Sequence, residues 1–211
     1  MLQTRKIAII GGTGRVGKYI AKRAVENGYH VRMLVRNPDN MIFRDHRIEI
    51  IQGDVLDVIS LRTVLKSCDI VMNTFGQPAK AEPVYSQVTE QILNIMDEFD
   101  ICRYIGVTGG SLNVTGDQKS IKNKIGARLF ALFFSKMIID KRRELKILEK
   151  SQVDWTLVRL PFVMEGKEKG KIKENELDMP GNFITNNDIA SFLIRQIDDK
   201  KYLRKTPLIS G

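Results

Sequence analysis

A glycine-rich turn near the start of the chain has the residue types and spacing of a phosphate-binding site. Residues 11–17 read Gly-Gly-Thr-Gly-Arg-Val-Gly and lie between the apolar run 6–10 and an amphipathic stretch. Glycines let the backbone approach a pyrophosphate closely, and the free N–H groups at a helix start stabilise its charge. The alternative is a turn that only packs a strand tightly against a helix. The candidate binding residues are Gly11, Gly12, Thr13, Gly14, Arg15, Val16 and Gly17.

The end of the second apolar run, residues 30–35, indicates which dinucleotide would bind. An acidic residue at this place binds a ribose 2′-hydroxyl, whereas an arginine accommodates a 2′-phosphate. The run is followed by Arg36, Asn37 and Pro38, without a carboxylate at its tip. Arg15 could approach the same phosphate from the glycine turn. These residues favour NADP(H) over NAD(H), and a solvated strand end is the alternative role of Arg36.

The elements that must position these residues follow from the hydrophobic pattern. Short apolar runs alternate with longer amphipathic segments along the whole chain, which is typical of an α/β fold. We predict strands over residues 6–10, 30–35, 48–51, 70–73, 103–107 and 155–160, and helices over 16–27, 55–66, 83–99, a long segment ending near Lys150, and 187–197. Right-handed crossovers then give a Rossmann-type doubly wound parallel sheet with helices on both faces. Ligands bind beyond the carboxyl ends of such strands.

Length and composition limit the number of domains and the classes of partner. The 211 residues suffice for one domain with a buried core, and no Pro-, Gly- or Ser-rich linker divides them. We therefore predict a single NAD(P)-binding domain over 1–211, with a small substrate-side portion at about 161–211. The formal net charge of +9 favours anionic ligands such as nucleotides. Nucleic acid is not an expected partner, because no nucleic-acid-binding motif is present.

Metal binding, secretion and membrane insertion are not expected from the sequence. Cys68 and Cys102 form neither a C-x-x-C pair nor a metal-ligand cluster with His30 and His46. No apolar stretch reaches the roughly 18 residues of a membrane span, and the first residues lead straight into the first strand instead of a secretion signal. We expect a cytoplasmic protein with reduced thiols, no metal site and no membrane partner.

An ordered set of motifs resembles the atypical short-chain dehydrogenase/reductases. After the glycine turn come LVRNP at 34–38, GDVLD at 53–57, DWTLVRLP at 154–161 and TNNDIASFLIRQIDD at 185–199. The chain is most similar to the subgroup of NAD(P)H-binding flavin and biliverdin reductases and of redox sensors of the nitrogen-metabolite-repressor type. The resemblance covers nearly the whole chain, and it implies a Rossmann fold and NAD(P)H-dependent chemistry.

The resemblance also implies contacts along the cofactor. Asp54 and Val55 match the pair that meets the adenine. The alternative for Asp54 is a cap of the following helix, and the two roles are compatible. Phe75 and Gly76 match the stretch beside the adenine-side ribose and the pyrophosphate, and a simple turn is the alternative for Gly76. Thr108 stands where relatives carry a hydroxyl that faces the nicotinamide.

Two more residues match the nicotinamide end of the family's site, and Ser111 lies close to Thr108 in the sequence. Ser111 lies three residues after Thr108, and Pro161 and Phe162 match the segment beside the nicotinamide carboxamide. The alternatives are a surface hydroxyl for Thr108 and Ser111, a strand terminator for Pro161 and a core aromatic for Phe162. Thr108 is a candidate for both catalysis and cofactor binding.

The sequence departs from the wider superfamily at its proton-transferring pair. Hydride-transferring members carry Tyr-x-x-x-Lys on the long helix after the fifth strand, where the tyrosine exchanges a proton and the lysine lowers its pKa and holds the ribose. Residues 137–141 read Met-Ile-Ile-Asp-Lys, so Met137 replaces the tyrosine and cannot transfer a proton. Lys141 remains a candidate catalytic and cofactor-binding residue, with an exposed helix lysine as the alternative.

Apolar side chains are concentrated just before Lys141, in more than one stripe. We predict that the excess lines a pocket for a planar substrate or forms a subunit contact, for which a homodimer is one option. Ordinary core packing is the alternative. The residues are Leu129, Phe130, Leu132, Phe133, Phe134 and Met137.

Two functions follow from these observations. Reduction of a flavin or a linear tetrapyrrole requires mainly that donor and acceptor stack, since water or the acceptor can supply the proton. The leading prediction is therefore an NADP(H)-dependent oxidoreductase that reduces a planar acceptor such as a flavin or quinone. The alternative is a catalytically silent NADP(H)-binding sensor, which the loss of the tyrosine favours. Epimerase or dehydratase chemistry on a nucleotide sugar is disfavoured, because the tyrosine and a large C-terminal substrate domain are both missing.

Overall fold

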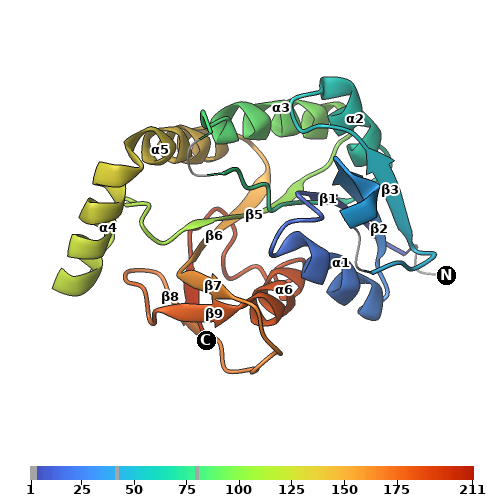
Figure 1. The fold of residues 1–211 in the computed structure, drawn as a ribbon. Helices are drawn as coiled ribbons and strands as arrows, with labels where there is room; N and C mark the ends of the chain where they lie inside the picture. Colours follow the sequence, from blue (N-terminus) through green and yellow to red (C-terminus); the bar gives the residue numbers. More distant parts are fainter. Residues whose placement is uncertain (1–3, 41–42, 79–80) are drawn as a thin grey trace.

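An eight-stranded sheet forms the centre of the molecule (Figure 1). The computed structural model describes residues 4–40, 43–78 and 81–211. The strands of this sheet are β1 (Lys6–Ile10), β2 (His30–Val35), β3 (Ile48–Gln52), β4 (Ile70–Asn73), β5 (Arg103–Gly109), β6 (Asp154–Leu160), β8 (Lys173–Asn175) and β10 (Leu208–Ser210). Their order across the sheet is β3-β2-β1-β4-β5-β6-β10-β8. All neighbours pair in parallel except β8 and β10, which are antiparallel.

The strand order reverses between β1 and β4, and this reversal determines where ligands bind. From β1 the chain continues outward to β2 and β3, and it then returns to form β4, β5 and β6 on the other side of β1. Ile7 is aligned with Val31 of β2 on one side and with Ile70 of β4 on the other. The loops leaving β1 and β4 therefore diverge and open a crevice at the carboxyl edge of the sheet. The predicted doubly wound α/β fold is confirmed.

Helices cover both faces of the sheet, as Figure 1 shows. They are α1 (Gly17–Glu26), α2 (Val58–Leu65), α3 (Tyr85–Glu98), α4 (Ile121–Phe133), α5 (Ser135–Lys150) and α6 (Asn186–Arg195), with a short 3-10 turn at Pro38–Asn40. Ile7 and Ile9 of β1 pack with α1 and α6, whereas Ala8 and Ile10 pack with α2, α3 and α5. Side chains alternate between the two faces of a strand, so a continuous apolar run supplies both cores.

The structure differs from the sequence prediction in two places. The long helical segment is two helices, because Phe134 leaves helical geometry at φ −128° and ψ 41° between α4 and α5. The C-terminal part contains short strands that we did not predict, namely β8, β10 and a separate two-stranded sheet of β7 (Phe162–Met164) and β9 (Phe183–Thr185). All six predicted strands are present, and their predicted starts differ by at most one residue.

Helix α4 stands apart from the rest of the fold. It extends from the edge of the molecule beyond α5 in Figure 1, and Ala127 is the one residue of this fully described helix that is buried. Across the described part of the chain, no helix combines the length and apolar content that crossing a bilayer requires.

Candidate functional site

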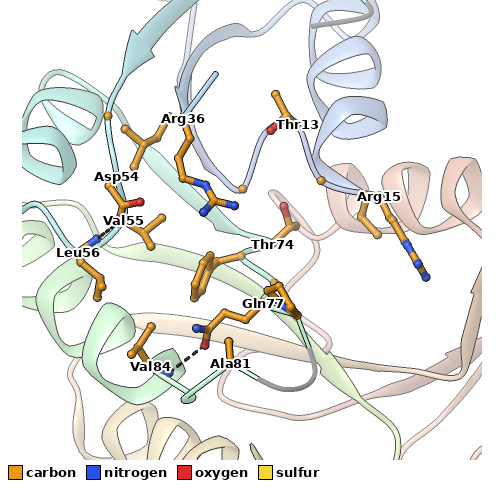
Figure 2. A pocket seen from close by; sticks show the side chains of 18 residues that line it. Thr13, Arg15, Arg36, Asp54, Val55, Leu56, Thr74, Gln77, Ala81 and Val84 are labelled. Atoms are coloured by element: carbon orange, nitrogen blue, oxygen red, sulfur yellow. Dashed lines mark hydrogen bonds between the residues drawn. The ribbon is translucent and has the colours of Figure 1, made fainter. Parts of the chain in front are cut away.

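A cavity of about 930 Å³ lies at the carboxyl ends of β1, β2, β3 and β4 (Figure 2). Its position matches the crevice that the reversal of strand order creates. Ten of the predicted binding residues line it: Gly11, Thr13, Gly14, Arg15, Val16, Arg36, Asp54, Val55, Phe75 and Gly76. The structure thus brings together residues from four separate loops that the sequence analysis assigned to one ligand.

The glycines of the turn have different roles. Gly11 adopts φ +79°, and a Cβ on it would lie 2.7 Å from the carbonyl oxygen of Thr74. A Cβ on Gly17 would lie 2.3 Å from the oxygen of Gly11, which reflects close packing of α1 against the turn. Gly12 likewise packs against the side chain of Met33 on β2, and neither Gly12 nor Gly17 is among the described residues that line the cavity. Gly11 and Gly14 face the ligand space.

The start of α1 can bind an anion. The N-cap residue is Val16, and no side chain accepts a hydrogen bond from the first N–H groups of this helix. These groups carry the positive end of the helix dipole toward the wall that Gly14 forms. The residues present therefore fit a ligand with a pyrophosphate group.

The side chains of the two arginines that line the cavity point in different directions. Figure 2 shows the guanidinium of Arg36 between the glycine turn and the Asp54 loop, whereas the side chain of Arg15 extends away from these residues. Arg36 follows the end of β2 directly. A phosphate in the part of the cavity beside Asp54 and Val55 would lie next to Arg36, and Arg15 would lie at the opposite side.

The structure separates two acidic residues that follow β3. Asp54 accepts a hydrogen bond from the N–H of Leu56 (2.9 Å) and lines the cavity. Helix α2 begins later than predicted, and its cap is Asp57, which accepts from the N–H groups of Ile59 and Ser60. The hydroxyl and the N–H of Ser60, with the N–H of Ile59, lower the pKa of Asp57. The alternative assignment of Asp54 as the helix cap is therefore wrong.

The loop after β4 forms the remaining wall and is held by its own side chains. Thr74 bonds to the carbonyl of Ile10 through both its N–H (2.9 Å) and its hydroxyl (3.0 Å). The amide of Gln77 accepts from the N–H of Val84 (2.9 Å) and donates to the carbonyl of Glu82 (3.1 Å). Eight further lining residues were not predicted as binding residues from the sequence: Leu34, Gly53, Leu56, Thr74, Gln77, Pro78, Ala81 and Val84. Most of them follow strand ends, which is the signal that could have found them.

A second cavity of about 290 Å³ lies at the carboxyl ends of β5 and β6. Pro161 and Phe162 line it, as do Ser111 and, from α4, Phe130. Phe162 is 74% exposed, so the alternative of a core aromatic is wrong. Since β4, β5 and β6 are neighbours in the sheet, the two cavities follow one another along the same edge.

The residues of the apolar segment before Lys141 do not behave as one group. Phe130 lines the second cavity, as predicted for a substrate pocket. Leu129, Leu132 and Phe133 are exposed instead, and Phe134 and Met137 are half-buried. Ordinary core packing is therefore wrong for the three exposed residues.

Thr108 lies near the end of β5, one residue before the lining residue Gly109. Its side chain is 5% exposed, and its hydroxyl has no hydrogen-bond partner among the described residues. A buried polar group without a partner costs free energy. A ligand group that reached this hydroxyl would remove that cost. Because the side chain is buried, the alternative of a surface hydroxyl is wrong for Thr108.

Lys141 is neither exposed nor part of the cavities described above. Its ammonium donates to Glu144 (2.8 Å) and lies 3.7 Å from the centre of the Tyr85 ring. Lys141 and Met137 are both absent from the described residues that line the two cavities. The candidate role in catalysis and cofactor binding thus finds no support in the geometry, because Lys141 joins α5 to α3.

A buried charged cluster holds the loop between β5 and α4, which forms part of the second cavity. Arg159 of β6 donates to both carboxylate oxygens of Asp117 (2.7 and 2.8 Å). The ammonium of Lys119 lies 3.5 Å from Asp117 and donates to the carbonyls of Gly110 (2.9 Å) and Leu112 (3.0 Å). Burial lowers the pKa of Lys119, although the Asp117 carboxylate opposes this shift. The cluster fixes the loop from the protein interior.

Comparison with known proteins agrees with this geometry. A family profile described as NAD(P)H-binding matches residues 11–200. An isoflavone reductase homologue from Nicotiana tabacum is 26% identical over an alignment of 226 positions, which covers 95% of this chain and 66% of that protein. The chain thus spans slightly less than two thirds of this relative.

Solved structures share the fold at low sequence identity. A wide-type short-chain dehydrogenase/reductase from Veillonella parvula in complex with NADP has a TM-score of 0.78 and 15% identity, covering 98% of this chain and 94% of that one. ChuY, an anaerobillin reductase from Escherichia coli O157:H7, has a TM-score of 0.78 and 15% identity over 98% and 97% of the two chains. From the family profile, the ordered motifs and the fold, we conclude that the chain belongs to the NAD(P)H-binding family of atypical short-chain dehydrogenase/reductases.

Proposed function

We propose that this protein is an NADP(H)-dependent oxidoreductase that reduces a planar acceptor such as a flavin or quinone. The observation that carries the proposal is the succession of two cavities along one sheet edge. The first has the glycine turn and Arg36, and the second is lined by the aromatic side chains of Phe130 and Phe162. Thr108, with its unpartnered hydroxyl, precedes the residues of the second cavity.

Each part of the site has a role in this proposal. The N–H groups at the start of α1 bind the pyrophosphate, Arg36 binds the 2′-phosphate, and Asp54 with Val55 contacts the adenine. The Thr108 hydroxyl orients the nicotinamide, which supplies a hydride when the cofactor is bound. Phe130 and Phe162 hold the planar acceptor against it by stacking. ChuY, which shares the fold, is an anaerobillin reductase, and this class of reaction fits the proposal.

The protein contributes orientation and not proton transfer. Met137 has no titratable group, and Lys141 is held by Glu144 away from the two cavities. Holding donor and acceptor in contact can lower a barrier by several kcal/mol without acid catalysis. In this proposal the proton comes from water or from the acceptor itself.

The test is to follow NADPH oxidation by purified protein with a panel of flavins and quinones. Loss of the absorbance of the reduced nicotinamide with one acceptor, above the rate without protein, supports the oxidoreductase. NADPH titration by fluorescence is done on the same samples. Tight binding without turnover by any acceptor would contradict the proposal and favour the alternative of a silent sensor.

Replacing Arg36 by alanine is expected to remove the preference for NADPH over NADH. A charge-assisted contact contributes about 1.5–3 kcal/mol, so NADPH affinity should fall roughly ten- to a hundredfold. NADH affinity should hardly change, because NADH lacks the 2′-phosphate. Isothermal titration of both cofactors measures the two affinities. The matched control is Arg15→Ala, which should keep the preference for NADPH, because the Arg15 side chain extends away from Arg36 and Asp54. Equal affinities of the wild type for both cofactors would contradict the role of Arg36.

Restoring the tyrosine at position 137 is expected to leave the rate unchanged. A general acid raises a rate about 10²- to 10⁴-fold only where it reaches the reacting groups. Met137 is not among the described residues that line the two cavities. Thr108→Val should slow turnover about tenfold through loss of nicotinamide orientation, while the adenine half still binds. Steady-state rates of both variants with a flavin acceptor check this. A large gain from Met137→Tyr would show that the enzyme has lost an acid that its chemistry needs.

A further inference from the structure

Helix α4 presents an apolar stripe that no other part of the described chain covers. Its large side chains are 51–80% exposed at five positions: Ile121, Ile125, Leu129, Leu132 and Phe133. With about 100° of rotation per residue, these positions fall within an arc of roughly 120° on one side of the helix. A soluble surface rarely exposes so many large apolar side chains in one row.

The charges of α4 all have one sign. The helix carries Lys122, Lys124 and Arg128 and contains no acidic residue. Asp178 lies at its start, but that carboxylate already accepts from the N–H of Ser120 and from the amide of Asn123. Lys124 and Arg128 therefore lie along one edge of the apolar stripe. Lys122 lies within the arc of the stripe and donates to the side chain of Asn182 (3.1 Å).

This combination determines which partner fits. A second copy of the chain in a symmetric pair would place the same three cations near each other, and like charges repel. An anionic bilayer surface satisfies both features, because its headgroups neutralise lysine and arginine and its acyl region receives apolar side chains. The basic helix with a bulky apolar side has the composition of interfacial helices.

We propose that α4 docks the protein peripherally on an anionic lipid surface. Leu132 and Phe133 enter the boundary between headgroups and acyl chains, while Lys124 and Arg128 contact lipid phosphates. The expectation of no membrane partner came from the lack of a spanning segment, and that lack does not bear on a helix lying in the interface.

The other side of α4 connects this surface to the second cavity. Asn123, Ala127 and Phe130 on that side line the cavity, so docking would place it beside the lipid. A planar acceptor dissolved in the bilayer, such as a quinone, would then reach the cavity without crossing water. This last step rests on the proposed function, whereas the docking itself does not.

Vesicle flotation tests the docking directly. Full-length protein is mixed with vesicles of phosphatidylcholine containing phosphatidylglycerol, and in parallel with vesicles of phosphatidylcholine alone. We expect binding to the anionic vesicles that is at least about tenfold tighter and that weakens as salt is raised. Absence of binding to the anionic vesicles would overturn the proposal.

Variants assign the binding to α4. Leu132→Gln/Phe133→Gln, which keeps the charge, should weaken vesicle binding by on the order of a hundredfold, since two large side chains no longer enter the lipid. The matched control is Val58→Gln/Ile59→Gln, two adjacent exposed apolar residues on α2, which should change binding less than about twofold. Lys124→Gln/Arg128→Gln should lower binding to the anionic vesicles about tenfold. Equal losses in the α2 control would overturn the assignment.

Light scattering and NADPH titration separate the other outcomes. If the wild type is a dimer in solution and Leu132→Gln/Phe133→Gln is a monomer, the α4 stripe is a subunit interface and the proposal is wrong. NADPH binding should be the same in the wild type and in this variant. A protein that docks on vesicles but binds no NADPH would contradict the proposed function and leave the docking intact.

Discussion

Replacing Gly14 by aspartate is expected to lower NADP(H) affinity by two orders of magnitude or more while the protein remains folded. Gly14 lines the first cavity, and a Cβ there would lie 3.0 Å from the oxygen of Gly11, a contact that a small displacement relieves. A carboxylate at this position would meet the phosphates where the N–H groups of α1 stabilise them, and it would repel their charge. The thermal shift that NADPH produces in the wild type should disappear.

Two further glycine variants make this result specific. Gly14→Ala adds the Cβ without the charge and should keep part of the NADPH-induced thermal shift. Gly17→Ala should instead destabilise the protein itself, because its Cβ would lie 2.3 Å from the backbone oxygen of Gly11. If Gly14→Asp retained the wild-type thermal shift, the phosphate site would not be at the glycine turn.

Replacing Arg159 by methionine is expected to lower the free energy of unfolding by about 3–5 kcal/mol, which is the usual cost of breaking a buried ion pair. The guanidinium is buried, donates to both oxygens of Asp117, and also donates to the carbonyls of Thr206 (2.9 Å) and Glu176 (3.2 Å). The variant leaves these acceptors buried without this donor. Urea unfolding of the wild type and the variant measures the difference.

The control is an ion pair with similar geometry at the surface. Arg62 bonds to Glu98 at 2.8 Å, but both side chains are 45% exposed, so Arg62→Met should cost at most about 1 kcal/mol. The double variant Arg159→Met/Asp117→Asn should recover part of the loss, because a neutral amide then replaces the buried carboxylate. Similar losses from Arg159→Met and Arg62→Met would show that burial does not determine the strength of the Arg159 pair.

The central sheet could be predicted because its strands differ clearly from their neighbours. β1 and β2 are nearly continuous apolar runs that supply two cores at once, and the glycine turn marks where β1 ends. Once the strands are located, the rule that ligands bind beyond their carboxyl ends brings Arg36 and Asp54 to one place. Ten of the predicted residues therefore line one cavity although they come from distant parts of the sequence.

The parts that were missed depend on contacts that no local pattern contains. β7, β8, β9 and β10 have three residues each, which is too short for an alternation to show. The role of Lys141 depends on Tyr85 of α3. The centre of the Tyr85 ring lies 3.7 Å from the ammonium nitrogen of Lys141. Glu144, three residues later on the same side of α5, was the one local signal for the ion pair.

The break between α4 and α5 was missed for a different reason. The apolar pattern continues through Phe130, Phe133 and Phe134, and residues 127–150 contain no Gly or Pro, so the sequence around the break reads as one helix. In the structure Phe134 turns the chain, and α4 is directed away from the sheet. α5 packs against α3, whereas α4 contacts the fold mainly through the side that carries Asn123, Ala127 and Phe130.

The position of β10 has a consequence for biosynthesis. This strand lies between β6 and β8, so residues 208–210 complete a sheet whose first strand begins at residue 6. A nascent chain that has emerged only as far as residue 200 can form the glycine turn and β1 to β6, but the backbone edge of β6 is still open. Open strand edges pair readily with other chains. We therefore expect aggregation during translation to arise mainly after β6 has emerged and before residues 208–210 pair with it.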